Sequence, residues 1–183
     1  RFELLRFSDE GLLGALRAKQ IDIAIAPWPK APSGLKNVPL GHDRLVAAVP
    51  ARSTFNIGSP VSAAELCEHT FLTSDYRATR GFEFHDFFLA ADIVPRTVVQ
   101  VQSLEMMLRL VGHGDGVTIQ PARVLRWNRP HRDVEVLPLA GPEIQVQWIA
   151  SHHRSANDDV ALAAARIADA FATQAAQATN ASP

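Results

Sequence analysis

Hydrophobic and polar residues alternate along the chain in blocks whose spacing predicts strands and helices in turn. The block "IDIAIAP" at residues 21–27 is a nearly continuous apolar run, which is typical of a strand buried on both faces of a parallel sheet. An alternating stretch at residues 2–7 predicts an earlier strand, and Leu12, Leu13 and Leu16 between the two recur at helical spacing. Strand, helix and strand in so short a span predict a βαβ unit.

The later blocks continue this alternation. Ser62 and Glu65 form the Ser-x-x-Glu pattern of a capping box, which predicts the start of a helix. Other helices are predicted at residues 82–91 and 157–177, and strands at residues 44–50, 70–74, 96–101, 134–139 and 144–151. Such a chain is expected to form an α/β fold with parallel or mixed sheets and to bind ligands at the carboxyl ends of strands.

The stretch "VQSLEMMLRLVGHGDGVTIQP" at residues 101–121 places three glycines between a predicted helix and a predicted strand. Ser103 is a good N-cap, and Gly112 and Gly114 suit the left-handed end of a helix. A helix start that faces the end of a strand suits an anion or a polar ligand group, although a serine there can also act as a cap alone.

The piece after this strand is less regular. Four arginines follow at intervals of three residues, from Arg123 to Arg132, but Pro130 interrupts any helix that would align them. We therefore interpret the piece as a solvated loop rather than a phosphate site.

Composition excludes several classes of function. The 183 residues carry a formal net charge of −1, so there is no basic surface of the kind that binds nucleic acid. The single cysteine, Cys67, cannot form an intramolecular disulfide and fits a reducing, cytoplasmic compartment. No apolar run is long enough to span a membrane. Neither His-x-x-x-His nor Gly-x-Ser-x-Gly occurs, so we expect no metal, no cofactor and no enzymatic activity.

Two motifs, in order and at the right separation, resemble a known family. "SDEGLLGALRAKQIDIAIAP" at residues 8–27 and the stretch at residues 101–121 resemble the effector-binding (regulatory) domain of LysR-type transcriptional regulators. The chain departs from the family pattern at Lys19, Asp115 and Gln120, where the family has a glycine, a hydrophobic residue and leucine. It also lacks the family's usual first strand and first helix.

The resemblance implies a two-lobed α/β fold similar to type II periplasmic binding proteins, with the effector in the cleft between the lobes. Lobe I is then expected at residues 1–48 and 147–183, and lobe II at residues 49–146. It further implies that a small anionic metabolite is coupled to DNA binding and transcription through a winged helix that is not in this chain. Domains of this family pair as dimers, which implies a homodimer here, or a tetramer of the full-length protein.

Positions at strand ends and helix starts supply the candidate effector contacts. They are Ser8, Pro27, Trp28, Thr73, Ser74, Thr79, Arg80, Gln102, Ser103 and Gln120. Trp28 can stack on a ring or pack as a loop indole, and Arg80 can pair with a carboxylate or remain a solvated surface residue. Gln120 can reach the ligand or satisfy a buried backbone group.

Two other functions are compatible with this fold. A solute-binding protein for transport would need an export signal or a lipidated N-terminal cysteine, and neither is visible. An enzyme, such as a dehydratase of aromatic biosynthesis, would need convergent acid–base groups, which the sequence does not reveal. We interpret the chain as the ligand sensor.

Overall fold

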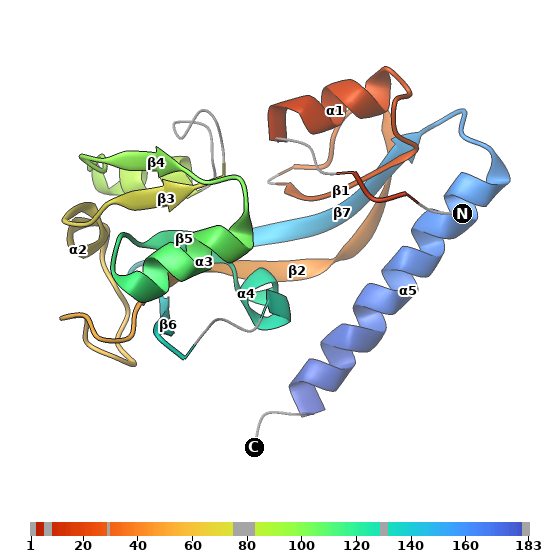
Figure 1. Ribbon diagram of the computed structural model, residues 1–183. Coiled ribbons are helices and arrows are strands. Elements are labelled where there is room, and N and C mark those ends of the chain that lie inside the picture. Colours follow the sequence, from red (N-terminus) through yellow and green to blue (C-terminus); the bar gives the residue numbers. More distant parts are fainter. Residues whose placement is uncertain (1–2, 6–8, 29, 75–82, 129–131, 181–183) are drawn as a thin grey trace. The chain divides into compact units, whose positions relative to one another are not determined.

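The structure of the protein is a computed structural model (Figure 1). It describes residues 3–5, 9–28, 30–74, 83–128 and 132–180. The chain divides into two compact units: unit 1 comprises Arg1–His42 with Val146–Pro183, and unit 2 comprises Asp43–Gln145. Two long strands, β2 (Leu35–Pro50) and β7 (Gln145–His153), contribute residues to both units.

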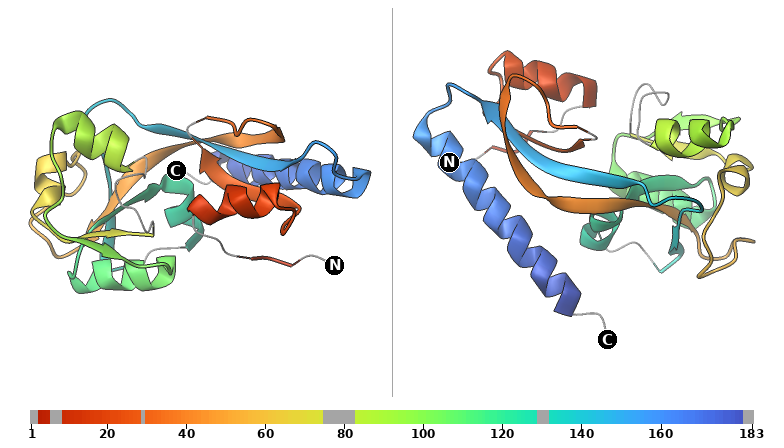
Figure 2. Two further views of the ribbon diagram at one scale, coloured as in Figure 1. Left: turned by 90° about the horizontal axis from the view of Figure 1, so that it is seen from above. Right: turned by 180° about the vertical axis from the view of Figure 1, so that it is seen from behind.

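Unit 1 is built on strands β1, β7 and the first part of β2. β1 (Ile23–Trp28) pairs antiparallel with β7, which is in turn the neighbour of β2 in the sheet (Figure 2). The helix α1 (Asp9–Arg17) closes one apolar cluster, in which its Leu16 is buried with Ala24 of β1 and Leu35 of β2. The helical spacing of the leucines in α1 is therefore the spacing of residues that face this cluster.

The second helix of unit 1 is α5 (Asp158–Asn180), which follows β7 directly. Asn157 caps its start, because its Oδ1 accepts a hydrogen bond from the backbone N–H of Val160 at 3.0 Å. The ring of Phe171 lies 6.1 Å from the ring of Trp148 on β7, so an aromatic contact packs the helix against the strand.

Two expectations about this unit were wrong. Residues Glu3–Leu5 form no strand, and Leu4 is 96% exposed. β1 pairs antiparallel with β7 and has no parallel partner among the described residues, so the expected βαβ unit is not formed there. Local alternation predicts extended backbone but does not identify the partner strand, and here the partner comes from the far end of the sequence.

Besides the end of β2, unit 2 contains the strands β3 (Phe71–Thr73), β4 (Val98–Gln100), β5 (Thr118–Pro121) and β6 (Val134–Pro138). These strands form two groups. β3 and β4 pair in parallel, whereas β5 and β6 each pair antiparallel with β2. A parallel bridge between Phe71 and Val117 places β5 beside β3, with Leu72 N–H donating to the Val117 carbonyl at 2.8 Å.

The helical segments of unit 2 pack on these strands. They are α2 (Ala63–Cys67), the π-helix η2 (Glu83–Phe88), the 3-10 helix η3 (Leu89–Ala91), α3 (Leu104–His113) and α4 (Ala122–Asn128). Met107, Leu108 and Val111 of α3 are buried in one cluster with Leu72 of β3 and Val46 of β2. The apolar face predicted from the spacing in α3 is thus the face that covers the core.

Two segments differ from the sequence-based expectation. Residues 83–91 are helical, but as a π turn followed by a 3-10 turn, with Phe88 packed edge-on against Phe71 at 4.9 Å. The piece interpreted as a solvated loop contains the helix α4. Its start is capped from a distance, because the Asp43 carboxylate accepts a hydrogen bond from Arg123 N–H at 2.9 Å.

The glycines after α3 have separate structural reasons. Gly114 ends the helix with φ +89°, a conformation that favours glycine. Gly116 lies where β5 approaches β3 most closely: a Cβ there would be 2.6 Å from the carbonyl oxygen of Thr70 and 2.9 Å from Cγ of Leu72. Gly112 is inside the helix, where a Cβ would meet only ordinary contacts at 3.5 Å.

Candidate functional site

The carboxyl ends of three strands in unit 2 lie side by side. β4, β3 and β5 run in the same direction, so the residues that follow them meet at one edge (Figure 1). The backbone N–H of Val101 donates to the carbonyl of Thr73 at 2.8 Å, which holds Gln102 and Ser103 beside the end of β3. Five candidate residues, Thr73, Ser74, Gln102, Ser103 and Gln120, are therefore at or near this edge.

Ser103 begins α3 with an incomplete cap. Its Oγ accepts a hydrogen bond from the backbone N–H of Met106 at 3.4 Å, longer than a typical N–H···O bond. Glu105 does not reach back to the cap, because it bonds to Arg109 at 2.9 Å. The exposed Ser103 hydroxyl donates no hydrogen bond to the described residues, so it can donate to a ligand.

Thr73 ends β3 with a buried side chain whose hydroxyl donates to Oε1 of Glu83 at 3.3 Å. This bond connects the end of β3 to the first turn of η2. Ser74, the next residue, is exposed at the same edge.

Gln120 is half-buried and lies against a buried polar pair. Its Nε2 donates to the Thr118 hydroxyl at 3.2 Å and approaches Sδ of Met107 at 3.6 Å, while the Thr118 hydroxyl donates to the same sulfur at 3.1 Å. The amide nitrogen is thus engaged, and the amide oxygen makes no hydrogen bond within the described residues. Gln120, which stands where the family has leucine, therefore offers its amide oxygen as a hydrogen-bond acceptor held in place by the bonds of its amide nitrogen.

In unit 1, Pro27 and Trp28 end β1 and both are half-buried. The indole Nε1 of Trp28 is buried and has no hydrogen-bond partner in the described part of the chain. A buried N–H without a partner is uncommon in a folded protein, so this donor is available to an acceptor that the chain does not supply.

A buried histidine of unit 1 was not singled out from the sequence. His152 is 2% exposed, its Nδ1 lies 3.0 Å from the carbonyl of His153, and its Nε2 has no partner among the residues described. Nothing in the neighbouring residue types distinguishes it from an exposed histidine, because its burial depends on the pairing of β1 with β7.

Three candidates, Ser8, Thr79 and Arg80, lie outside the described residues. Within the described ranges, no three His, Cys, Asp or Glu side chains are placed to hold a metal ion, and no helix is long and apolar enough to cross a membrane. Burial raises the pKa of the Cys67 thiol, with a further contribution from the negative charge of Glu68, which favours the unreactive protonated form.

Comparison with known proteins decides the family. A family model described as the LysR substrate binding domain matches residues 1–172. The chain belongs to this family. The resemblance identified from the two sequence motifs is thereby confirmed, and the members of this family are transcription regulators.

A curated relative of this LysR-family domain is the malonate utilization transcriptional regulator of Klebsiella pneumoniae. The two are 28% identical over 131 residues, which are 70% of this chain and 42% of that protein. The chain therefore spans less than half the length of this relative.

Solved structures confirm the α/β fold class. An OxyR C206 mutant of Corynebacterium glutamicum matches with a TM-score of 0.73 and 20% identity, over 97% of this chain and 57% of the other. The regulatory domain of MetR from N. meningitidis matches with a TM-score of 0.70 and 14% identity, over 88% and 75%. The LysR-family domain described here thus has the periplasmic-binding-protein-like fold of LysR regulatory domains.

Proposed function

We propose that this chain is the effector-sensing domain of a LysR-type regulator and that a small anionic metabolite binds where β3, β4 and β5 end. The observation that carries this proposal is the incomplete cap at Ser103. The first N–H groups of α3 and the Ser103 hydroxyl are donors at the positive end of a helix dipole, which favours a carboxylate or phosphate group.

Other polar groups at the same edge support the proposal. The amide oxygen of Gln120 offers an acceptor, and the Ser74 side chain is exposed there. From the family resemblance alone we also propose Ser8, Pro27, Trp28, Thr79 and Arg80 as effector contacts.

The biological role follows from the family. A metabolite that binds one conformation of the domain better than another shifts the population and so changes DNA binding through a part of the protein outside this chain. A regulator of this kind acts where the DNA is, so we propose that it works in the cytoplasm.

The test is a pair of serine variants at two helix starts. Candidate ligands are screened by thermal shift with aliphatic and aromatic carboxylates, led by malonate because of the named relative. Ser103→Ala should weaken binding of the ligand found by about tenfold to a hundredfold, the effect of losing a hydrogen bond to a charged group. Isothermal titration calorimetry measures this change.

Ser62→Ala is the matched control, because Ser62 caps α2 of the same unit. It should lower the free energy of unfolding by about 1 kcal/mol and leave ligand affinity unchanged. Equal ligand affinities in wild type and Ser103→Ala would show that Ser103 acts only as a helix cap. Turnover of the ligand by the protein would contradict the sensor function.

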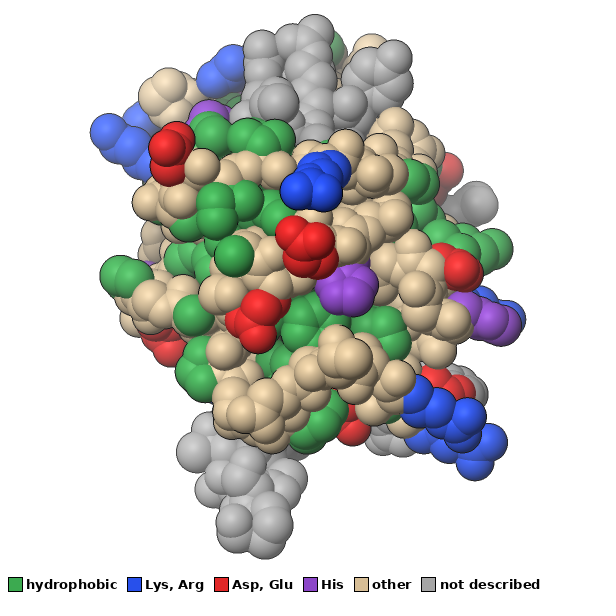
Figure 3. All heavy atoms as spheres, turned by 90° about the vertical axis from the view of Figure 1, so that its left-hand side faces the viewer, with side chains coloured by type: hydrophobic (Ala, Val, Ile, Leu, Met, Phe, Trp, Pro, Cys, Tyr) green, Lys and Arg blue, Asp and Glu red, His purple; other side chains and the backbone are tan. Residues whose placement is uncertain are grey.

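We also infer that the domain forms a homodimer through the open edge of β4, separately from any larger assembly of the full-length protein. β4 pairs only with β3 in the described structure, and Val98 and Val99 are 37% and 41% exposed. Leu89 and Val94 are exposed nearby in sequence, and Figure 3 shows hydrophobic side chains on a face of unit 2, interspersed with acidic and basic side chains.

A charge placed on this strand tests the dimer. Val99→Lys should shift the protein from dimer to monomer, because a lysine on an edge strand opposes pairing with another strand. Light scattering after size exclusion measures the mass, and Val136→Lys, an exposed valine on β6, is the control. A dimer that persists in Val99→Lys would place the contact elsewhere.

A further inference from the structure

A hollow of unit 2 runs along one side of α3. Its volume is about 790 Å³, and one side of α3 lines it from Glu105 to Gly114. Leu108 and Pro50 provide apolar lining, and Gly112 leaves space because it has no side chain. The volume lies in the range of small-molecule sites, which is roughly 300–1,000 Å³.

Basic side chains from three separate segments line this groove. Arg52 follows β2, Arg109 and His113 belong to α3, and Arg132 precedes β6. Segments so distant in sequence contribute these cations to a single hollow, although the chain as a whole carries a formal net charge of −1.

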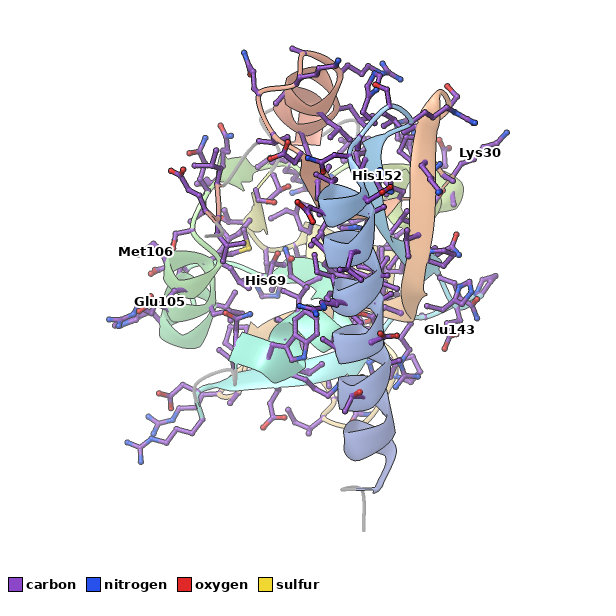
Figure 4. All side chains as sticks on the ribbon, turned by 90° about the vertical axis from the view of Figure 1, so that its right-hand side faces the viewer. Lys30, His69, Glu105, Met106, Glu143 and His152 are labelled. Atoms are coloured by element: carbon purple, nitrogen blue, oxygen red, sulfur yellow. The ribbon has the colours of Figure 1, made fainter. Side chains whose placement is uncertain are left out.

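The groove keeps a positive balance after its own acids are counted. Three arginines against the two carboxylates of Glu105 and Asp133 leave one formal positive charge, without counting His113. Arg109 is paired with Glu105, but both side chains are mostly exposed, at 69% and 76%, and such a pair on a helix surface is weak. Figure 4 shows Glu105 directed outward from α3. Arg52 and Arg132 form no ion pair or hydrogen bond with the described residues.

We propose that this groove binds a small polyanion with two or more phosphate or carboxylate groups. A guanidinium binds either group through two parallel hydrogen bonds, and arginines from three segments match a ligand whose charges are separated. α3 has ten residues and so spans about 15 Å. The basic groove residues Arg109 and His113 therefore lie about 1.7 and 2.8 turns beyond Ser103, away from the proposed effector contact at the helix start.

The experiment uses pyrophosphate and citrate as probes on the whole chain. Either should raise the melting temperature by about 3–5 °C at ten times its dissociation constant. Sodium chloride at matched ionic strength should not do so. The stronger of the two probes identifies phosphate or carboxylate as the preferred group.

Variants assign the effect to the groove. Arg52→Gln with Arg132→Gln should weaken binding at least tenfold, whereas Arg44→Gln, which removes an exposed arginine paired with Glu143 outside the groove, should not. Ser103→Ala should leave polyanion affinity unchanged, which separates this proposal from that of the effector site. An equal shift with sodium chloride, or unchanged affinity in the double variant, would overturn the proposal.

Discussion

Two helices of unit 2 begin with serine, and their starts are completed to different degrees. At α2, the Ser62 hydroxyl donates to Oε2 of Glu65 at 2.6 Å, the Ser62 N–H donates to the same oxygen at 2.8 Å, and Glu65 N–H donates back at 3.3 Å. At α3, the Ser103 side chain makes a single hydrogen bond within the described residues, accepting from Met106 N–H at 3.4 Å. The side chains of Ser62 and Glu65 complete the capping box of α2, which is called the closed start below. The start of α3 has no such box, and its Ser103 hydroxyl can still donate a hydrogen bond to a ligand, so it is called the open start.

The difference comes from the position of one glutamate. Glu65 is the third helical residue of α2, from which a side chain reaches back to the cap. In α3 the acid is the second helical residue, Glu105, which bonds forward to Arg109, and the third is Met106. At α3, the absence of an acid at the third helical position leaves the Ser103 hydroxyl without an acceptor among the described residues, which is the basis of the proposed ligand contact.

The largest expected effect comes from a substitution at Gly116, where β5 approaches β3 beside the open start of α3. Gly116→Ala puts a Cβ 2.6 Å from the Thr70 carbonyl oxygen and should force β3 and β5 apart. We expect a loss of about 2–3 kcal/mol in the free energy of unfolding, typical of overpacking against backbone. Urea denaturation measures it, and Gly112→Ala, which meets only ordinary contacts, is the control. Equal stabilities of the two variants would show that β3 and β5 do not approach this closely.

The next prediction converts the open start into a closed one. Met106→Glu places the acid at the third helical position, where it should complete a capping box with Ser103 and raise stability by about 0.5 kcal/mol. Affinity for an anionic ligand should fall at least tenfold, because a carboxylate then occupies the donors. Met106→Gln forms the same cap without the charge and should cause a smaller loss in calorimetry. Unchanged affinity in Met106→Glu would exclude the start of α3 as the binding site.

Much of the fold could be predicted because its signals are local. The capping box at Ser62 and the cap at Ser103 depend on residues three apart, and both helices begin where the sequence predicts. The start of α4 could not be predicted, because its cap is Asp43, which is distant in sequence. The expectation that β1 belongs to a parallel βαβ unit was wrong for the same reason: its antiparallel pairing with β7 is not encoded near β1.

In the candidate site, too, some features have a local sequence signal and others depend on residues that are distant in sequence. Alternation predicts that Thr73 lies at the end of one strand and that Ser103 follows another, and parallel pairing of β3 with β4 then brings the two strand ends together. The groove of Arg52, Arg109 and Arg132 has no local signal, since its three arginines converge only in the folded unit. For Arg132 the sequence favoured a solvated loop, and its neighbours in the fold suggest the further role proposed above.

The smallest expected effect is a pH dependence of the unfolding free energy that comes from the capping box of α2. Hydrogen bonds from the Ser62 hydroxyl and then from the Ser62 N–H lower the pKa of Glu65. A carboxyl pKa that is lower in the folded state stabilises the protein above the ordinary carboxyl pKa, and this contribution is lost as pH falls through the lowered pKa. Because Glu65 is exposed, solvent screening should limit it to about 0.3 kcal/mol. The difference in unfolding free energy between wild type and Glu65→Gln should shrink with acidification, and in a Ser62→Ala background most of that pH dependence should disappear. A pH dependence that persists undiminished without the Ser62 hydroxyl would show that the closed start of α2 does not depend on its serine.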